Sequence, residues 1–267
     1  MKTNKFFIFT LLFPVFVFSQ NKDGSGLFIS ALGVGYEQRY NEMILPYEFS
    51  GAAYNLNLEW QMRHSEKWFS DAKFNLHFAP LFAKTSAANV PAFNVSEHCF
   101  GFDLEYQLLR KIIDKQNFTL FAGGSLELMP EYEIFLDLST NLAGSLTKQF
   151  FAMDLSLGGA VFAEYKFNKI RITDNFSFPL VAGAFYPHYQ VPPFYYSGNY
   201  FVFASIGKLN RISNYLNFEI PVFVNDKILN TFCVGYNFNY EYSTIRDNFI
   251  RRIGHNFLVG VRFGITK

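Results

Sequence analysis

The chain has 267 residues, of which 20% are aromatic and only 17% charged, and its formal net charge is +1. This near-neutral balance, without runs of Lys or Arg, excludes the phosphate-binding strip of a nucleic-acid-binding protein, so no nucleic acid partner is expected. The aromatic content exceeds what a soluble core needs, so many rings are expected to face something other than water.

A secretory signal peptide is predicted over residues 1–20. Lys2 and Lys5 supply its charged start, and residues 6–18 supply its apolar run. A membrane anchor is the alternative, but the apolar run is short for a span and no charge cluster follows it. Beyond this segment the chain lacks the roughly eighteen continuous apolar residues that a membrane-crossing helix needs. We therefore expect a single exported β domain over residues 21–267.

Residues 52–78 show the clearest pattern in the chain. Apolar and polar side chains alternate on both sides of a turn at residues 64–67, and a strand sends alternate side chains to opposite faces. One face of this hairpin is therefore apolar and the other polar. The only two Trp residues, Trp60 and Trp68, lie on the apolar face and flank the turn. An aromatic girdle at a membrane interface would place them there.

Further strands follow the same alternation along the chain. They are expected over residues 27–40, 100–108, 118–128, 151–165 and 176–186. In the last of these, the side chains predicted to face outward are Phe176, Phe178, Leu180, Ala182, Ala184 and Tyr186. Residues 111–117 are expected to form a short turn, and residues 86–97, 130–149 and 187–199 are expected to form loops. Long and short connections thus alternate.

Residues 200–224 have two interpretations, and the choice fixes the number of strands. If residues 200–209 and 216–224 are separate strands, the chain has about eleven, and an odd number would leave its ends on opposite sides of a membrane. We therefore assign residues 200–211 to the preceding loop, with some helix, and treat residues 216–224 as one strand. Two more strands then finish the chain, for a total of about ten, with twelve as the alternative.

These features predict an all-β fold, a closed antiparallel up-and-down transmembrane β-barrel with short periplasmic turns and longer outer loops. Closure is expected in lipid because an open sheet edge would leave backbone groups without hydrogen bonds. The alternative is a soluble sandwich or a lipocalin-like barrel, but such folds place their rings inside and their charges outside. The pattern therefore favours the bacterial outer membrane, with membrane lipid around the barrel.

The final strand carries a resemblance to a known group of proteins. Its two faces are formed by His255, Phe257, Val259, Val261, Phe263 and Ile265 and by Leu258, Gly260, Arg262 and Gly264. With the signal ending Phe18-Ser19-Gln20 and the strand at residues 232–242, rich in Tyr, Phe and Asn, the chain resembles the outer-membrane β-barrel proteins of the Bacteroidota, many of unassigned function. The resemblance implies that the barrel-assembly machinery recognises the last strand. Thr266 and Lys267 follow where such strands often end on an aromatic ring.

An apolar exterior leaves the lumen polar. The side chains predicted to line it as a charged network are Glu59, Asp71, Lys73, His77, Asp103, Glu105, Glu127, Asp154, Glu164 and Arg262. Acids outnumber bases, and isolated buried charges are costly, so these groups are expected to pair. A barrel of about ten strands is barely wider inside than its side chains, which favours an occluding plug. The alternative is a narrow water path that prefers cations.

No sequence motif indicates a catalytic centre, a metal site or a cofactor. Neither a glycine-rich phosphate loop nor HExxH nor a CxxC pair occurs. His77, Asp103 and Glu105 share the inward face of neighbouring strands, where a base and carboxylates could meet. The consecutive residues Ser96-Glu97-His98 do not point the same way on a strand, so their adjacency is no evidence of a catalytic group.

The cysteines and one loop complete the prediction. Cys99 and Cys233 are expected near opposite ends of the barrel, too far apart to form a disulfide. In the aromatic loop at residues 187–199, the candidates for surface binding are His188, Tyr189, Phe194, Tyr195 and Tyr196, with packing over the barrel mouth as the alternative. We expect a non-enzymatic structural or surface-binding barrel with an occluded lumen. The alternatives are a narrow diffusion channel and an outer-leaflet protease or lipid hydrolase.

Overall fold

The computed structural model describes residues 26–41, 45–83, 95–137, 148–185, 201–224, 228–245 and 248–265. In this part of the chain no helix is long and apolar enough to cross a membrane. The predicted signal peptide and the predicted loop at residues 187–199 lie outside the described residues.

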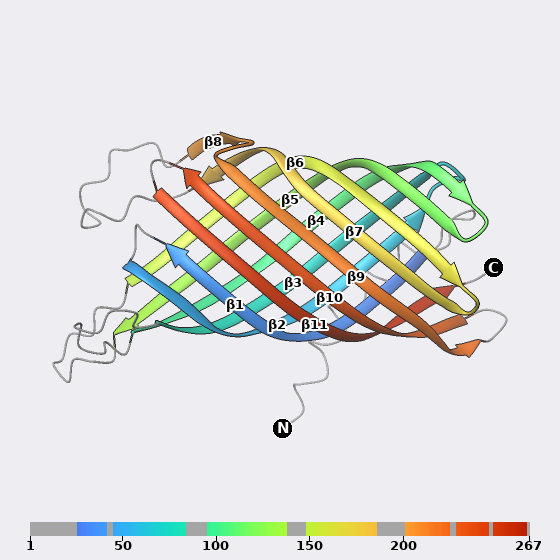
Figure 1. Ribbon diagram of the computed structural model, residues 1–267, viewed down its shortest axis with the longest axis horizontal. Helices are drawn as coiled ribbons and strands as arrows, with labels where there is room; N and C mark the ends of the chain where they lie inside the picture. Colours follow the sequence, from blue (N-terminus) through green and yellow to red (C-terminus); the bar gives the residue numbers. More distant parts are fainter. Residues whose placement is uncertain are drawn as a thin grey trace, which may run out of the picture.

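Ten strands close into an antiparallel barrel (Figure 1). They are β1 (Gly26–Asn41), β2 (Leu45–Arg63), β3 (Trp68–Ala83), β4 (Val95–Lys115), β5 (Phe118–Asp137), β6 (Lys148–Phe167), β7 (Ile170–Phe185), β9 (Leu209–Val224), β10 (Ile228–Ile245) and β11 (Asn248–Ile265). Each pairs with the next, and β1 pairs with β11, which closes the ring. This confirms the barrel and its ten strands, and the alternative of twelve is wrong.

A short strand, β8 (Phe201–Ser205), lies where a loop over residues 200–211 was predicted, and that prediction is wrong. Both β8 and β9 pair antiparallel with β7, so they run in the same direction as two parts of one wall strand. Between them Gly207 has φ +99°, a conformation that favours glycine. Pro179 of β7 lies opposite this interruption and has no N–H to donate to a ladder. The strand number therefore stays even.

The outward assignment of Ala182 and Ala184 is also wrong, because both are buried inside the barrel. On β6, Leu157 pairs with Val181 while Gly158 pairs with Pro179, so Leu180 has no partner there. One unpaired residue exchanges the two faces of a strand for all residues after it. Alternation alone could not locate this bulge.

The loop predicted over residues 130–149 is strand at both of its ends, since β5 continues to Asp137 and β6 begins at Lys148. Pro130 suggested a break in the sequence. In the barrel it pairs with β6, and the ladder to β4 lapses opposite it. A proline thus removes one hydrogen-bonded pair without ending the strand. Similarly, β4 extends to Lys115, so the turn predicted over residues 111–117 spans only residues 116–117.

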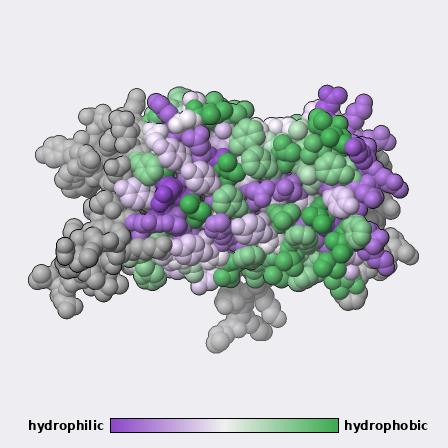
Figure 2. Space-filling view, in the orientation of Figure 1, coloured by the Kyte–Doolittle hydropathy of each residue, from purple (hydrophilic) through white to green (hydrophobic). Residues whose placement is uncertain are grey.

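The barrel wall is apolar outside and polar inside. Large apolar side chains are exposed on every strand of the ring, among them Leu32, Val34, Tyr54, Leu76, Leu104, Leu126, Leu155, Val181, Phe218, Val234 and Phe257. On the face shown in Figure 2, hydrophobic side chains gather mostly over the half of the wall nearer the short turns. Many Glu, Asn, Gln and Arg side chains are instead buried within. A soluble barrel would bury the apolar set, so this wall faces lipid.

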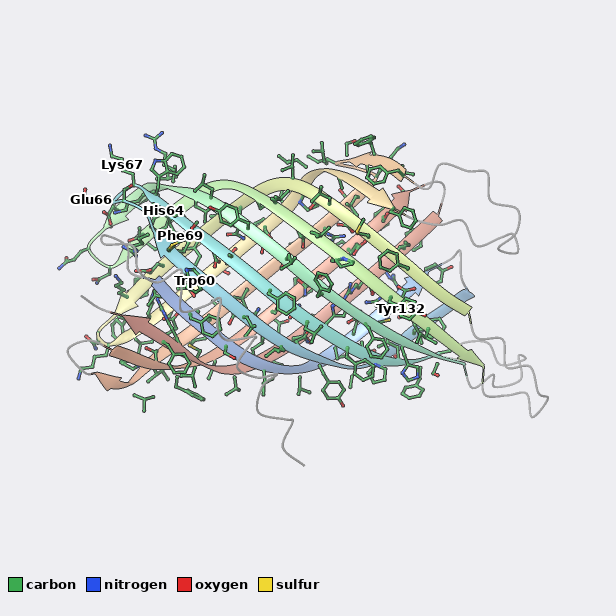
Figure 3. The ribbon with its side chains drawn as sticks, turned by 180° about the vertical axis from the view of Figure 1, so that it is seen from behind. Trp60, His64, Glu66, Lys67, Phe69 and Tyr132 are labelled. Atoms are coloured by element: carbon green, nitrogen blue, oxygen red, sulfur yellow. The ribbon has the colours of Figure 1, made fainter. Side chains whose placement is uncertain are left out.

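The two ends of the barrel differ. The connections at residues 64–67, 116–117 and 168–169 are short, and those between β3 and β4, β5 and β6, and β7 and β8 are longer. In outer-membrane barrels the short turns face the periplasm. Figure 3 places the turn residues His64, Glu66 and Lys67 at that end, with Trp60 close to it along β2. Trp68 begins β3 directly after the same turn.

A charge on the lipid-facing wall should cost most at mid-depth. Leu104 and Ile112 lie on the same face of β4 and both are exposed, but Ile112 is close to the short turn. We predict that Leu104→Arg lowers the free energy of unfolding in phospholipid vesicles by about 2–4 kcal/mol, and Ile112→Arg by about 0–1 kcal/mol. Equal losses for the two variants, measured by denaturant titration, would contradict the lipid-facing assignment.

Candidate functional site

The lumen contains all the charged residues predicted from the sequence. Six of them are buried, namely Glu59, Asp71, His77, Asp154, Glu164 and Arg262. The other four, Lys73, Asp103, Glu105 and Glu127, line a central cavity. The sequence-based network lacked Arg39, Glu97, Glu131, Glu133, Arg211 and Arg252, which are also inside. Glu97, Glu131, Glu133 and Arg211 were missed because they lie in segments predicted as loops, and β4 in fact begins at Val95. The alternation of β1 and β11 could have shown Arg39 and Arg252.

Near the periplasmic end, ion pairs tie together strands that are far apart in the sequence. Arg171 of β7 pairs with Glu164 of β6 at 2.6 Å and with Glu219 of β9 at 3.1 Å. Arg262 of β11 also contacts Glu219, and Arg63 of β2 lies 3.2 Å from Glu164. The guanidinium groups therefore neutralise both buried carboxylates in this layer, and their fixed geometry suits such bidentate contacts.

Aromatic rings fill the lumen beside these ion pairs. Phe69, Phe121 and Phe162 come from β3, β5 and β6, and their ring centroids are 4.8–6.1 Å apart. All three are buried, together with Leu109 and Ala160. Arg63 and Arg171 lie over the Phe121 and Phe162 rings at 5.9 and 6.0 Å. Apolar packing with cation–π contacts thus occupies this end of the lumen.

Above the rings, amide and carboxylate side chains form a hydrogen-bonded layer. Asn175 donates to Asp71 at 2.8 Å, and Gln107 donates to Asn175 at 2.9 Å. Gln107 also donates to Glu105 at 2.8 Å, and Gln61 donates to Glu59. Buried polar groups need such partners, and here they come from strands on different sides of the barrel.

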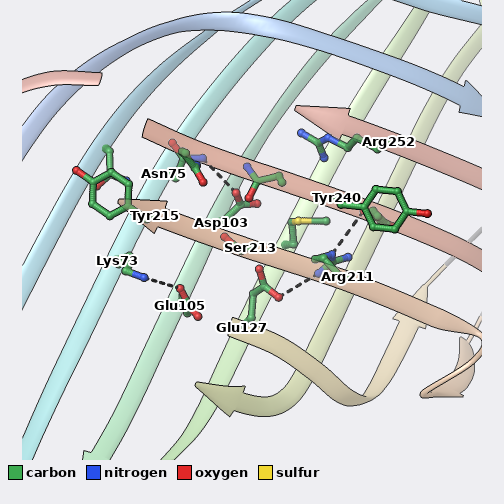
Figure 4. Close-up of a pocket in the computed structure, with 15 residues that line it drawn as sticks. Lys73, Asn75, Asp103, Glu105, Glu127, Arg211, Ser213, Tyr215, Tyr240 and Arg252 are labelled. Atoms are coloured by element: carbon green, nitrogen blue, oxygen red, sulfur yellow. Dashed lines mark hydrogen bonds and ion pairs between the residues drawn. The ribbon is translucent and has the colours of Figure 1, made fainter. Parts of the chain in front are cut away.

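A central cavity lies in the lumen among polar and charged side chains (Figure 4). Lys73 pairs with Glu105 at 3.1 Å, and Asn75 donates to Asp103 at 3.2 Å. The volume of this cavity that the centre of a water molecule can reach is about 60 Å³. One buried water occupies roughly 10–15 Å³ by this measure, so the cavity holds a few waters but no large solute.

Arg211 of β9 forms the main cross-barrel contact at this level. It pairs with Asp154 at 2.7 Å, with Glu127 at 3.1 Å and with Glu241 at 3.5 Å. No other basic side chain in the described part of the chain pairs with these three carboxylates. Their ionisation in the lumen therefore depends on a single guanidinium.

Towards the outer end, a second group of charges surrounds Arg39 and Arg252. Both contact Glu37 and Glu131, and Arg252 also donates to Nε2 of His77 at 3.2 Å. The His77 ring lies over Gly101, where a Cβ would come within 2.3 Å of the ring. Glycine at position 101 thus makes space for the imidazole. Beside these charges lies an apolar cluster of buried residues that includes Phe49, Leu81, Ala152, Ala184 and Leu209. Phe49 pairs with Arg39 across the strands, and Ala152 pairs with Glu131.

The predicted combination of a base with two carboxylates does not form. His77 contacts Arg252 and Glu131 rather than Asp103 and Glu105, which bond to Asn75 and Lys73.

Ser96 and His98 lie 3.4 Å apart, and the His98 ring stacks on Phe78, while Glu97 points into the lumen. Among the described residues no carboxylate pairs with His98, so a complete triad is not assembled. Cys99 and Cys233 are both buried and free.

Comparison with solved structures finds other barrels. The chain is 10% identical to the outer membrane protease OmpT from Escherichia coli, with 91% of this chain and 97% of that one covered and a TM-score of 0.45. The translocator domain of autotransporter NalP from Neisseria meningitidis is 7% identical, with 97% of this chain and 94% of that one covered and a TM-score of 0.42. The outer membrane protein OprG from Pseudomonas aeruginosa is 10% identical, with 91% of this chain and 97% of that one covered and a TM-score of 0.36. These scores mark a loose likeness, from which nothing follows about activity or partners. No family model and no curated protein matches the sequence.

The location follows from the geometry of the wall. A closed barrel of even strand number, apolar outside and polar inside, is the form in which proteins cross the bacterial outer membrane. The chain is an outer-membrane β-barrel.

Removing Arg211 should destabilise the barrel strongly, because Asp154, Glu127 and Glu241 would lose their shared cation. We predict that Arg211→Met lowers the free energy of unfolding by about 3–5 kcal/mol, and that adding Asp154→Asn restores part of the loss.

The control is Arg63→Met. The Arg63 side chain is 42% exposed, and its partner Glu164 would still form ion pairs with Arg171 and Lys166. Its expected cost is at most about 1 kcal/mol. Similar losses of unfolding free energy for Arg211→Met and Arg63→Met in denaturant titration would contradict the role of Arg211 as the shared cation of three buried carboxylates.

Proposed function

We propose that this protein is a non-enzymatic outer-membrane barrel whose lumen is closed to diffusion and which acts as a structural or binding element at the cell surface. The observation that carries the proposal is the buried cluster of Phe69, Phe121 and Phe162, which project into the lumen from β3, β5 and β6 on one side of the barrel. The guanidinium groups of Arg63 and Arg171 lie over two of these rings. We take the close packing of these rings and guanidinium groups as the barrier to water and ions at that level.

The ion pairs beside the cluster support the same proposal. Arg171 joins β7 to β6 and β9, and it also donates to Gln61 of β2 across the barrel at 3.3 Å. A solute would have to break several charge-assisted bonds at once, and each such bond contributes roughly 1.5–3 kcal/mol. A permanently open pore would instead keep its lining charges solvated.

A second candidate, a narrow cation-preferring channel, has one observation in its favour. Four acids line the central cavity against three bases. The acids are Asp103, Glu105, Glu127 and Glu241, and the bases are Lys73, Arg211 and Arg252. In this alternative the aromatic cluster would act as a gate rather than a permanent seal.

The finer aspects of the proposal rest on the sequence. The Bacteroidota type is supported by the signal ending Phe18-Ser19-Gln20 and by the Tyr, Phe and Asn content of β10. Recognition by the barrel-assembly machinery is supported by the alternation of β11. The aromatic residues within residues 187–199 are the proposed contact with a surface ligand.

Conductance separates the two candidates. We predict that the wild-type barrel gives no channel steps in planar lipid bilayers. The double variant Phe121→Ala/Phe162→Ala, which empties the centre of the aromatic cluster, should give small steps that prefer cations because of the acidic cavity above.

The control is Phe74→Ala/Phe102→Ala, which removes two rings 5.9 Å apart from the lipid-facing wall and should stay closed. Heat-modifiable mobility on a gel verifies that each variant is folded. Regular conductance of the wild-type protein would refute the closed lumen and favour the channel.

A further inference from the structure

The charges of the outer layer do not balance within the described lumen. Arg39 and Arg252 each contact both Glu37 and Glu131, with Arg252 at 2.9 Å from Glu37 and 3.1 Å from Glu131. The charges of these two guanidinium groups equal those of the two carboxylates. Any further carboxylate in this layer adds negative charge that these four groups do not neutralise.

Glu97 and Glu133 are two such carboxylates. Arg39, already shared with Glu37 and Glu131, is the basic side chain that pairs with them, at 3.8 Å from Glu97 and 2.8 Å from Glu133. Glu133 is only 6% exposed and accepts from Arg39 through Oε1, while its buried Oε2 has no hydrogen-bond partner in the described chain. A buried carboxylate oxygen without a partner is costly, and a bound ion or proton would relieve that cost.

A thiol completes the group. Cys99 precedes Gly101 on the inward face of β4, and its Sγ lies 3.0 Å from Oε1 of Glu97. One donor atom from each of Glu97, Cys99 and Glu133 lies within 4.8 Å of the others, and all three residues are buried. Glu97 and Glu133 also line a small cavity of about 30 Å³, enough for an ion with a water molecule. Arg39, Arg251 and Arg252 line the same cavity.

We propose that Glu97, Cys99 and Glu133 form a site for a divalent cation of borderline softness, of which Zn²⁺ is the representative. A thiolate with two carboxylate oxygens leaves one position of a tetrahedral site for water, whereas Ca²⁺ and Mg²⁺ prefer oxygen ligands alone. Binding releases the proton of Cys99 to solvent, so the charge of +2 faces three negative groups, namely the thiolate and the two carboxylates. One negative charge then remains beside Arg39. The sequence carries no metal motif because the donors come from two strands, β4 and β5.

The test uses Co²⁺ as a spectroscopic probe on the full barrel folded in detergent and freed of metal by a chelator. A thiolate–cobalt charge-transfer band should appear, saturate at one ion per barrel and disappear when Zn²⁺ is added. Cys99→Ala should abolish the band and weaken Zn²⁺ binding by on the order of tenfold or more. Glu97→Gln and Glu133→Gln should weaken binding while leaving the band visible at higher Co²⁺.

Cys233→Ala is the matched control, because Cys233 is the other buried, free cysteine. It belongs to β10, whereas the proposed site is formed by β4 and β5. It should keep both the band and the affinity. Zn²⁺ should also raise the unfolding temperature of the wild type and of Cys233→Ala but not of Cys99→Ala.

Three results would overturn the proposal. The first is the absence of a charge-transfer band in a wild-type barrel that heat-modifiable mobility shows to be folded, which would mean that Glu97 and Glu133 share a proton instead. The second is a band that survives Cys99→Ala, and the third is a site that takes Ca²⁺ or Mg²⁺ in preference to Zn²⁺.

Discussion

The structure depends on one constraint, the lack of water in the bilayer core. A backbone N–H or carbonyl facing lipid has no solvent to bond, so every strand needs two neighbours and the sheet must close. Side chains obey the same constraint, which explains why apolar groups occupy the outer face and charged groups the lumen. The irregular positions of the strands obey the same constraint. Pro130 and Pro179 both lie where pairing with one neighbouring strand is interrupted, so no backbone N–H is needed there.

The pairing of buried charges determines how the side chains of the lumen are arranged. Buried ion pairs contribute little net stability, since desolvation offsets much of their attraction, but an unpaired buried charge is strongly unfavourable. The lumenal network is therefore better understood as fixing which strands face one another across the barrel. Arg211 and Arg171 each connect acids from different strands. The same network leaves Glu97 and Glu133 with a single shared cation, and the proposed metal site follows from that surplus.

The sequence predicted the parts of the fold that depend on local alternation. The hairpin of β2 and β3 and the inward direction of Asp71 and Lys73 follow from the two-residue period of a strand. The number of ten strands needed a further constraint, that both ends of the barrel lie on the same side of the membrane. The faces of Ala182 and Ala184 could not be predicted, because the bulge at Leu180 depends on the partner strand rather than on local residues. Pairing partners across the lumen were equally hidden, since no local pattern states which acid meets Arg211.

The central claim is that a single wall separates lipid from a closed polar lumen, and the alternation of lipid access along β7 tests it most directly. Spin labels placed one at a time on β7, in a chain whose two cysteines are replaced, report contact with lipid-soluble oxygen. The account predicts high access at Phe176 and Phe178, then a change of phase at Leu180, with high access at Val181 and Gly183 and low access at Ala182 and Ala184. Uniform access along the strand, or an alternation that continues through Leu180 without the change of phase, would contradict it.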